Sequence, residues 1–149
     1  MIVIKRTNNQ DDDFRQLVAQ LDAYLAKTDG DEHGFYNQYN GLDGIKCAVV
    51  AYIDGTPVGC GAFKQYNKST VEVKRMYSAP DRRGQGIGRK ILQELEDWAA
   101  KLGYERVVLE TGKRQTEAVR FYPSLGYTAI ENYGQYQGMD NSLCFSKQL

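Results

Sequence analysis

The chain is short of the residue types that build metal centres and disulfide frameworks. It has one histidine, His33, and three cysteines, Cys47, Cys60 and Cys144, with no CxxC pair among them. These residues offer too few soft ligands for a zinc site, and we expect three reduced thiols and no metal. Neither His33 nor Cys144 has a spacing that indicates a nucleophile–histidine pair.

The chain also lacks long apolar runs and an excess of charge of either sign. No segment approaches the roughly 20 apolar residues of a membrane span, and the N-terminus has no apolar run typical of a signal peptide, so we expect a cytoplasmic protein. Nineteen Lys and Arg balance nineteen Asp and Glu, which argues against nucleic acid or an anionic membrane as a partner. Without repeats or linkers, 149 residues predict a single domain over 1–149.

What is present is a regular succession of strand and helix patterns. The periodicities predict strands at 2–6, 47–53, 56–66, 69–77, 105–110, 127–132 and 142–147, and helices at 11–27, 87–102 and 115–125. The aromatic residues 32–40 fit either a short helix or a loop. One apolar stripe of the second helix should pack on the sheet: Ile87, Ile91, Leu92, Leu95, Trp98, Ala99 and Leu102.

Asp54-Gly55 is a strong signal for a β-hairpin, because a type I′ turn needs positive φ at both central positions. Counting back from this turn pairs Cys60 roughly with Val49 and not with Cys47. The hairpin therefore gives no reason to expect a disulfide.

The stretch "RRGQGIGRK" at 82–90 lies between a predicted strand and a predicted helix. Glycines let a phosphate approach the backbone, and the N–H groups of a first helical turn lack intrahelical partners, so this arrangement can bind an anion. Two familiar nucleotide-binding motifs do not fit this stretch. The GxGxxG motif would need glycine in place of Arg89, and a P-loop would need Gly-Lys-Ser/Thr in place of Arg89, Lys90 and Ile91. The alternative is a merely flexible basic turn.

Arg83-x-x-Gly86-x-Gly88 resembles the acetyl-CoA signature of the GNAT superfamily of N-acetyltransferases. "VEVKRMYSAPDRRGQGIGRKIL" is similar to that family's strand, loop and glycine turn, and "TEAVRFYPSLGY" is similar to its later helix. The resemblance covers about residues 45–148. It implies an α+β, three-layer fold whose mostly antiparallel sheet is splayed at the acetyl-CoA site. It also implies that the turn binds coenzyme A through Arg83, Gly84, Gln85, Gly86, Ile87, Gly88 and Arg89.

The chemistry of amine acetylation requires a base. An alkylammonium has a pKa of about 10, so a proton must leave before nitrogen can attack a thioester. The resemblance nominates Glu72, in the central strand, as this base, with or without an ordered water. Glu110 is the rival, and a solvated charge on a half-exposed strand is the other interpretation of Glu72.

The resemblance also implies roles around the thioester. The amide of Met76, after a bulge in the central strand, would stabilise the oxyanion, while Tyr77 and Ser78 would pair with the pantetheine arm. Tyr122 corresponds to the family's general acid, although a buried tyrosine can equally be a core residue. Gln115 stands where the family often has asparagine, and Pro123 is expected to disturb the helix at Tyr122.

The acceptor is the least determined part of the prediction. Strand alternation places Lys74 or Arg75 on the cleft side, where a cation would attract a carboxylate and repel a polyamine. Tyr133 and Tyr136, with the aromatics at 35–39, would line the binding site of a small ligand. These features predict an amino acid or an amino-acid-like amine, unless Lys74 and Arg75 only bind coenzyme A phosphates or pair with surface carboxylates.

Three interpretations therefore stand. The chain is an acetyl-CoA-dependent N-acetyltransferase of a small-molecule amine, an acyl-CoA-binding regulatory module without turnover, or a domain that binds another phosphate or a protein. Glutamate and tyrosine at the expected positions favour the first. A monomer and a homodimer are both compatible with the sequence.

Overall fold

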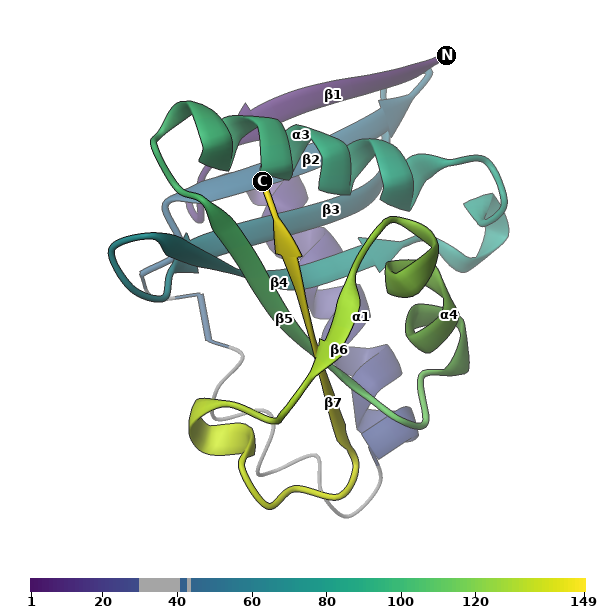
Figure 1. Ribbon diagram of the computed structural model, residues 1–149. Helices are drawn as coiled ribbons and strands as arrows, with labels where there is room; N and C mark the ends of the chain where they lie inside the picture. Colours follow the sequence, from purple (N-terminus) through teal and green to yellow (C-terminus); the bar gives the residue numbers. More distant parts are fainter. Residues whose placement is uncertain (30–40, 43) are drawn as a thin grey trace.

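The computed structural model describes residues 1–29, 41–42 and 44–149 (Figure 1). The strands are β1 (Ile2–Thr7), β2 (Cys47–Ile53), β3 (Thr56–Gln65), β4 (Thr70–Ser78), β5 (Arg106–Gly112), β6 (Thr128–Ile130) and β7 (Ser142–Gln148). The helices are α1 (Asp12–Asp29), α3 (Ile87–Lys101) and α4 (Thr116–Ser124), with short 3-10 turns η2 (Pro80–Arg82) and η3 (Gly134–Tyr136). None of these helices is long and apolar enough to cross a membrane.

The strands form one sheet in the order β1-β2-β3-β4-β5-β7-β6. All neighbours are antiparallel except β4 and β5, which pair in parallel over only three positions, from Thr70↔Arg106 to Glu72↔Val108. Beyond Glu72 the two strands diverge, toward the side of the molecule that carries α4 (Figure 1). The predicted mixed, mostly antiparallel and splayed sheet is confirmed.

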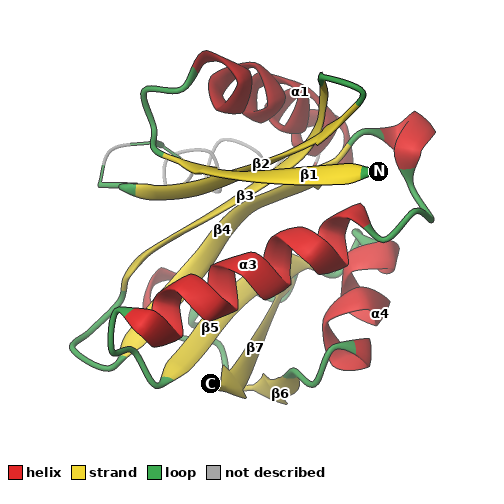
Figure 2. Ribbon diagram, turned by 90° about the horizontal axis from the view of Figure 1, so that it is seen from above, coloured by secondary structure: helices red, strands yellow, loops and turns green. Residues whose placement is uncertain are grey.

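Helices cover both faces of the sheet, with α1 on one side and α3 on the other (Figure 2). The α3 face holds alternate strand residues such as Val49, Val71 and Val107, and the α1 face holds the intervening ones, such as Val50. The predicted stripe of α3 is buried except for Trp98, which is half-buried, and Leu102, which is the C-cap and is 56% exposed.

The β2–β3 hairpin has the predicted turn, with φ of +50° at Asp54 and +78° at Gly55. Cys60 pairs with Val50, one position from the prediction, because the register shifts at Ala51 and Tyr52. All three cysteines are free thiols, as expected.

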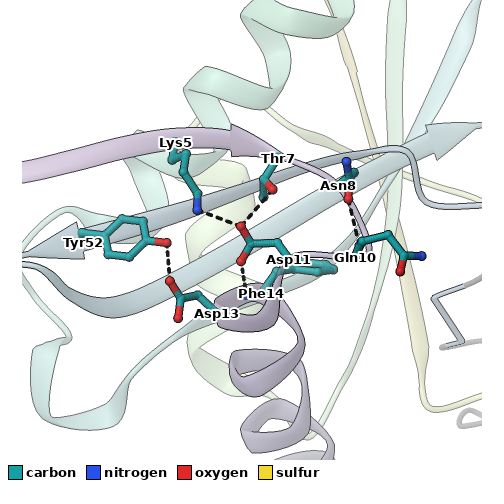
Figure 3. A network of polar contacts seen from close by, with 8 residues as sticks. All are labelled: Lys5, Thr7, Asn8, Gln10, Asp11, Asp13, Phe14 and Tyr52. Carbon is teal, nitrogen blue, oxygen red and sulfur yellow. Dashed lines mark hydrogen bonds and ion pairs between the residues drawn. The ribbon is translucent and has the colours of Figure 1, made fainter.

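Helix α1 is fixed at its start by Asp11, whose Oδ1 accepts the N–H of Phe14 at 2.9 Å as an N-cap (Figure 3). The other oxygen of Asp11 binds the Lys5 ammonium at 2.7 Å and the Thr7 hydroxyl at 2.9 Å. Burial raises the pKa of Asp11, but the hydrogen bonds from Lys5, Phe14 and Thr7 together hold it below its ordinary value. The network joins β1 to the start of α1.

Candidate active site

The glycine-rich turn leads from β4 through η2 into α3. Gly84 and Gly86 have φ of +82° and +80°, a left-handed conformation that costs residues with a Cβ about 1–2 kcal/mol. Gly86 is the N-cap of α3, and among the described residues no side chain caps it. The first-turn N–H groups can therefore bind an external anion, with the helix dipole in favour.

The glycines of the turn differ in their surroundings. A Cβ at Gly84 or Gly86 would meet no protein atom within 4 Å, whereas a Cβ at Gly88 would lie 3.2 Å from Cζ of Phe121 in α4. Gly84 and Gly86 thus leave the backbone open to a ligand, while Gly88 lets α3 approach α4.

A cavity of about 420 Å³ opens above this turn, between α1, the end of β4 and α4. Its lining contains all of the residues predicted for the cofactor except Gln85, which is exposed in the same turn. These residues are Met76, Tyr77, Ser78, Arg83, Gly84, Gly86, Ile87, Gly88, Arg89, Gln115 and Tyr122. At its mouth Arg83 pairs with Glu117 of α4 at 3.2 Å and lies over the ring of Tyr24 of α1.

A second, smaller cavity of about 110 Å³ lies on the α1 face of the sheet, where β4 and β5 diverge. Its lining brings together predicted catalytic and acceptor residues: Glu72, Lys74, Arg75, Met76, Glu110, Tyr122 and Tyr136. Five residues line both cavities, namely Leu21, Met76, Gln115, Ala118 and Tyr122. The two cavities therefore meet at these five residues, which include Met76 and Tyr122.

The bulge expected in the central strand is present in β4. Lys74 pairs with Ala62 and Tyr77 with Cys60, so Gly61 alone faces both Arg75 and Met76. Arg75 takes a φ of +63°, which reverses the alternation of side chains. As a result Lys74 and Arg75 both point to the α1 face, where strand alternation alone would have placed only one.

Arg75 and Lys74 are used differently despite being neighbours. The guanidinium of Arg75 is almost fully buried under α1, pairs with the carboxylate of Asp22 and lies 3.4 Å from the carbonyl oxygen of Val18. The sequence left open whether Lys74 and Arg75 only pair with carboxylates, and Arg75 does pair with one. Lys74 extends into the smaller cavity instead, and burial lowers the pKa of its ammonium although Glu72 acts in the opposite direction.

Glu72 is 4% exposed and lies on the floor of the smaller cavity. Its Oε2 accepts a hydrogen bond of 2.7 Å from the Tyr133 hydroxyl, and its Oε1 lies 3.9 Å from Nζ of Lys74. Burial, followed by the charge of Glu72, raises the pKa of Tyr133. Tyr133 therefore stays protonated and donates to the carboxylate, so Glu72 is not a solvated surface charge.

The contact between Tyr133 and Glu72 was not predicted, because 61 positions separate the two residues and no periodicity links them. Tyr133 was predicted to wall the ligand, but Tyr136 rather than Tyr133 lines the cavity. The Asn132 side chain holds this loop by donating to the carbonyls of Tyr136 and Met139, each at 3.1 Å. The aromatics predicted at 35–39 lie outside the described residues.

Tyr122 is 6% exposed, and helix α4 continues through it to Ser124. Pro123, which was expected to disturb the helix at Tyr122, lies within the last turn of α4, where little helix remains to be disturbed. Burial, followed by the charge of Glu110, raises the pKa of the Tyr122 phenol. A tyrosine that keeps its proton at neutral pH can serve as a donor.

The comparison with protein families agrees with this geometry. Residues 12–127 match the model of the acetyltransferase (GNAT) family. The chain belongs to the GNAT family. An IAA acetyltransferase of Azospirillum brasilense is 34% identical over 99% of this chain and 98% of its own.

Solved GNAT structures share the whole fold. A Klebsiella pneumoniae protein assigned as an acyl-CoA N-acyltransferase has a TM-score of 0.84 at 30% identity, over 100% of this chain and 98% of the other. YncA of Salmonella typhimurium, solved with acetyl-CoA, has a TM-score of 0.71 at 20% identity, over 100% and 94%. The GNAT chain described here is thus an acetyl-CoA-dependent N-acetyltransferase, and the fit of its glycine turn and larger cavity to a phosphate-bearing ligand agrees with that.

Proposed function

We propose that this protein transfers an acetyl group from acetyl-CoA to the primary amine of a small molecule by direct attack, with Glu72 as general base and Tyr122 as general acid. The observation that carries the proposal is the position of Tyr122 in the lining of both cavities, while Glu72 lines only the smaller one. An amine held beside Glu72 would thus meet a thioester that enters from the glycine turn.

The roles of the residues follow from the bonds that change. Glu72 takes a proton from the ammonium, and the free amine forms a bond to the thioester carbon. The N–H of Met76, which follows the bulge, donates to the oxyanion that develops. The C–S bond then breaks and the thiolate takes the phenolic proton of Tyr122, while the amide nitrogen loses its second proton to solvent.

The acceptor we favour is an amino acid or an amino-acid-like compound. The smaller cavity admits only a small molecule, and it is lined by the cation of Lys74 as well as by the two carboxylates. A polyamine or an aminoglycoside would bring several like charges to Lys74. The buried Tyr136 adds an aromatic side chain to the lining.

The first test is release of free thiol from acetyl-CoA in the presence of a panel of amines that contains amino acids, monoamines, polyamines and aminoglycosides. We expect turnover with small amines. If the protein binds acetyl-CoA by titration calorimetry and releases no thiol with any amine, it is an acyl-CoA-binding module and the proposed function is wrong.

The second test concerns the two catalytic residues. Glu72→Gln and Tyr122→Phe should each lower kcat by about 10²- to 10⁴-fold, while acetyl-CoA binding survives, because each removes a positioned proton-transfer group. Glu110→Gln is the matched control in the same cavity. Full activity of Glu72→Gln together with inactivity of Glu110→Gln would transfer the role of base to Glu110.

A further inference from the structure

The ammonium group of Lys74 is buried in the lining of the smaller cavity. The Lys74 side chain is 6% exposed, and its Nζ finds no hydrogen-bond partner among the described residues. Oε1 of Glu72 lies 3.9 Å from this Nζ, which is beyond hydrogen-bond distance. Leaving a charged donor unsatisfied in the interior costs more than leaving a neutral one, so this position is one that a ligand oxygen would stabilise.

Two neighbouring groups have partners in the protein. Oε2 of Glu72 accepts the Tyr133 hydroxyl, and an N–H of the Arg75 guanidinium binds Asp22, although the buried Nε of Arg75 has no hydrogen-bond partner among the described residues. The charge of Arg75 is thus paired with a carboxylate at hydrogen-bond distance, whereas that of Lys74 is not, and Lys74 lies beside the carboxylate that we propose as the base. A cation and a carboxylate side by side in a small cavity match a ligand that carries both charges itself.

Resting on the acetyl transfer proposed above, we propose that Lys74 Nζ binds the carboxylate of an α-amino acid whose amino group lies beside Glu72. An α-amino acid carries its nitrogen and its carboxylate on one carbon, which suits the 3.9 Å between Lys74 Nζ and Glu72 Oε1. An ω-amino acid separates the two groups by several bonds. The zwitterion also adds no net charge to a cavity that is lined by buried charged groups.

The side chain of the amino acid must be small or must point toward the larger cavity. The cavity has a volume of about 110 Å³, and the buried Tyr136 is part of its lining. This geometry disfavours peptides and protein N-termini, because the carboxyl group next to their free amine is part of a peptide bond. Lys74 thus selects for a free carboxylate.

The experiment compares matched acceptors. The wild-type protein is assayed by thiol release with standard L-amino acids, with the amide of each and with the decarboxylated amine of each. We expect kcat/KM for the preferred amino acid to exceed that for its decarboxylated amine by about 10- to 100-fold, the range of a charge-assisted hydrogen bond. The amide should lie between the two, because its carbonyl accepts a bond but carries no charge.

Lys74→Met and Lys74→Gln then test the residue itself. Both remove the charge at similar side-chain length, and neither leaves a buried unpaired cation, so both should fold. The ratio of kcat/KM for the amino acid to kcat/KM for its decarboxylated amine should fall toward one in both variants, chiefly because KM for the amino acid rises. Lys101→Met, an exposed lysine at the end of α3 on the opposite face of the sheet, is the control and should keep the ratio.

Each outcome separates the two proposals. Thiol release from simple amines with no preference for amino acids would overturn the Lys74 subsite and leave the acetyl transfer intact. A preference for amino acids that survives in folded Lys74→Met and Lys74→Gln would also overturn it. Absence of thiol release with every amine would overturn the proposed function itself.

Discussion

Replacing Tyr133 with Phe removes one hydroxyl and tests whether Glu72 acts as the base. The Tyr133 hydroxyl donates to Oε2 of Glu72 at 2.7 Å, in a site where Glu72 is 4% exposed. The ring should stay in place, because it packs edge-on against Tyr66 and Tyr136 with centroids 5.3 Å and 5.6 Å away. The substitution therefore removes a donor to the carboxylate and little else.

The size of the effect follows from the strength of that hydrogen bond. A hydrogen bond to a buried charge contributes about 1.5–3 kcal/mol, and about 1.36 kcal/mol corresponds to a tenfold change in rate. Lys74 remains near the other oxygen, so we expect the lower end of this range. The value of kcat/KM should fall by about tenfold, because the Tyr133 hydroxyl holds the carboxylate in the position from which it takes the proton of the amine.

The assay is thiol release at saturating acetyl-CoA with varied amine. Tyr127→Phe is a matched control, since it also removes a 2.7 Å hydrogen bond from a buried tyrosine to a carboxylate, that of Glu96, and neither residue lines either cavity. The control should lower stability without changing kcat/KM. An unchanged kcat/KM in a folded Tyr133→Phe variant would refute the link to the base.

Two further outcomes test the turn and the start of α1. Gly86→Val should raise KM for acetyl-CoA at least tenfold, because its φ of +80° and its open surroundings serve the ligand; Gly103→Val, with similar backbone strain at φ +96°, should destabilise without changing KM. Asp11→Ala should lower the free energy of unfolding by about 1 kcal/mol in urea titrations. Since the folded pKa of Asp11 lies below its ordinary 3.8, that difference should hold at neutral pH and vanish as the pH falls below about 4.

Much of the fold could be predicted because local signals coincide with it. Asp54-Gly55 fixes the hairpin, since few other dipeptides take positive φ at both positions. The apolar stripe ending at Gly103 fixes α3, and the spacing of Gly84 and Gly86 fixes the turn before it. The larger cavity follows from that turn, which is why nearly all of its predicted residues line it.

The acceptor side could not be predicted to the same depth, because it depends on contacts between distant segments. Tyr133 reaches Glu72 only through the path of the last loop, which Asn132 holds by hydrogen bonds to the backbone. No local pattern encodes that path. The sequence likewise offered no reason to assign different roles to Lys74 and Arg75. In the structure Arg75 pairs with Asp22 of α1, whereas the Lys74 side chain faces the smaller cavity.

The bulge in β4 explains why one strand can serve both halves of the site. Before it, Glu72 and Lys74 point to the α1 face, and the reversed alternation at Arg75 brings the Met76 side chain to the α3 face. A strand that paired regularly with β3 would use its backbone groups in the sheet, whereas Gly61 here faces two residues and leaves the ladder locally disrupted. Because β5 has already diverged at this point, Met76 borders both cavities on the side away from β3. In the mechanism proposed above, the bulge and the divergence would act together: the bulge would direct the N–H of Met76 to the thioester, and the divergence of β5 would leave space for the substrate beside it.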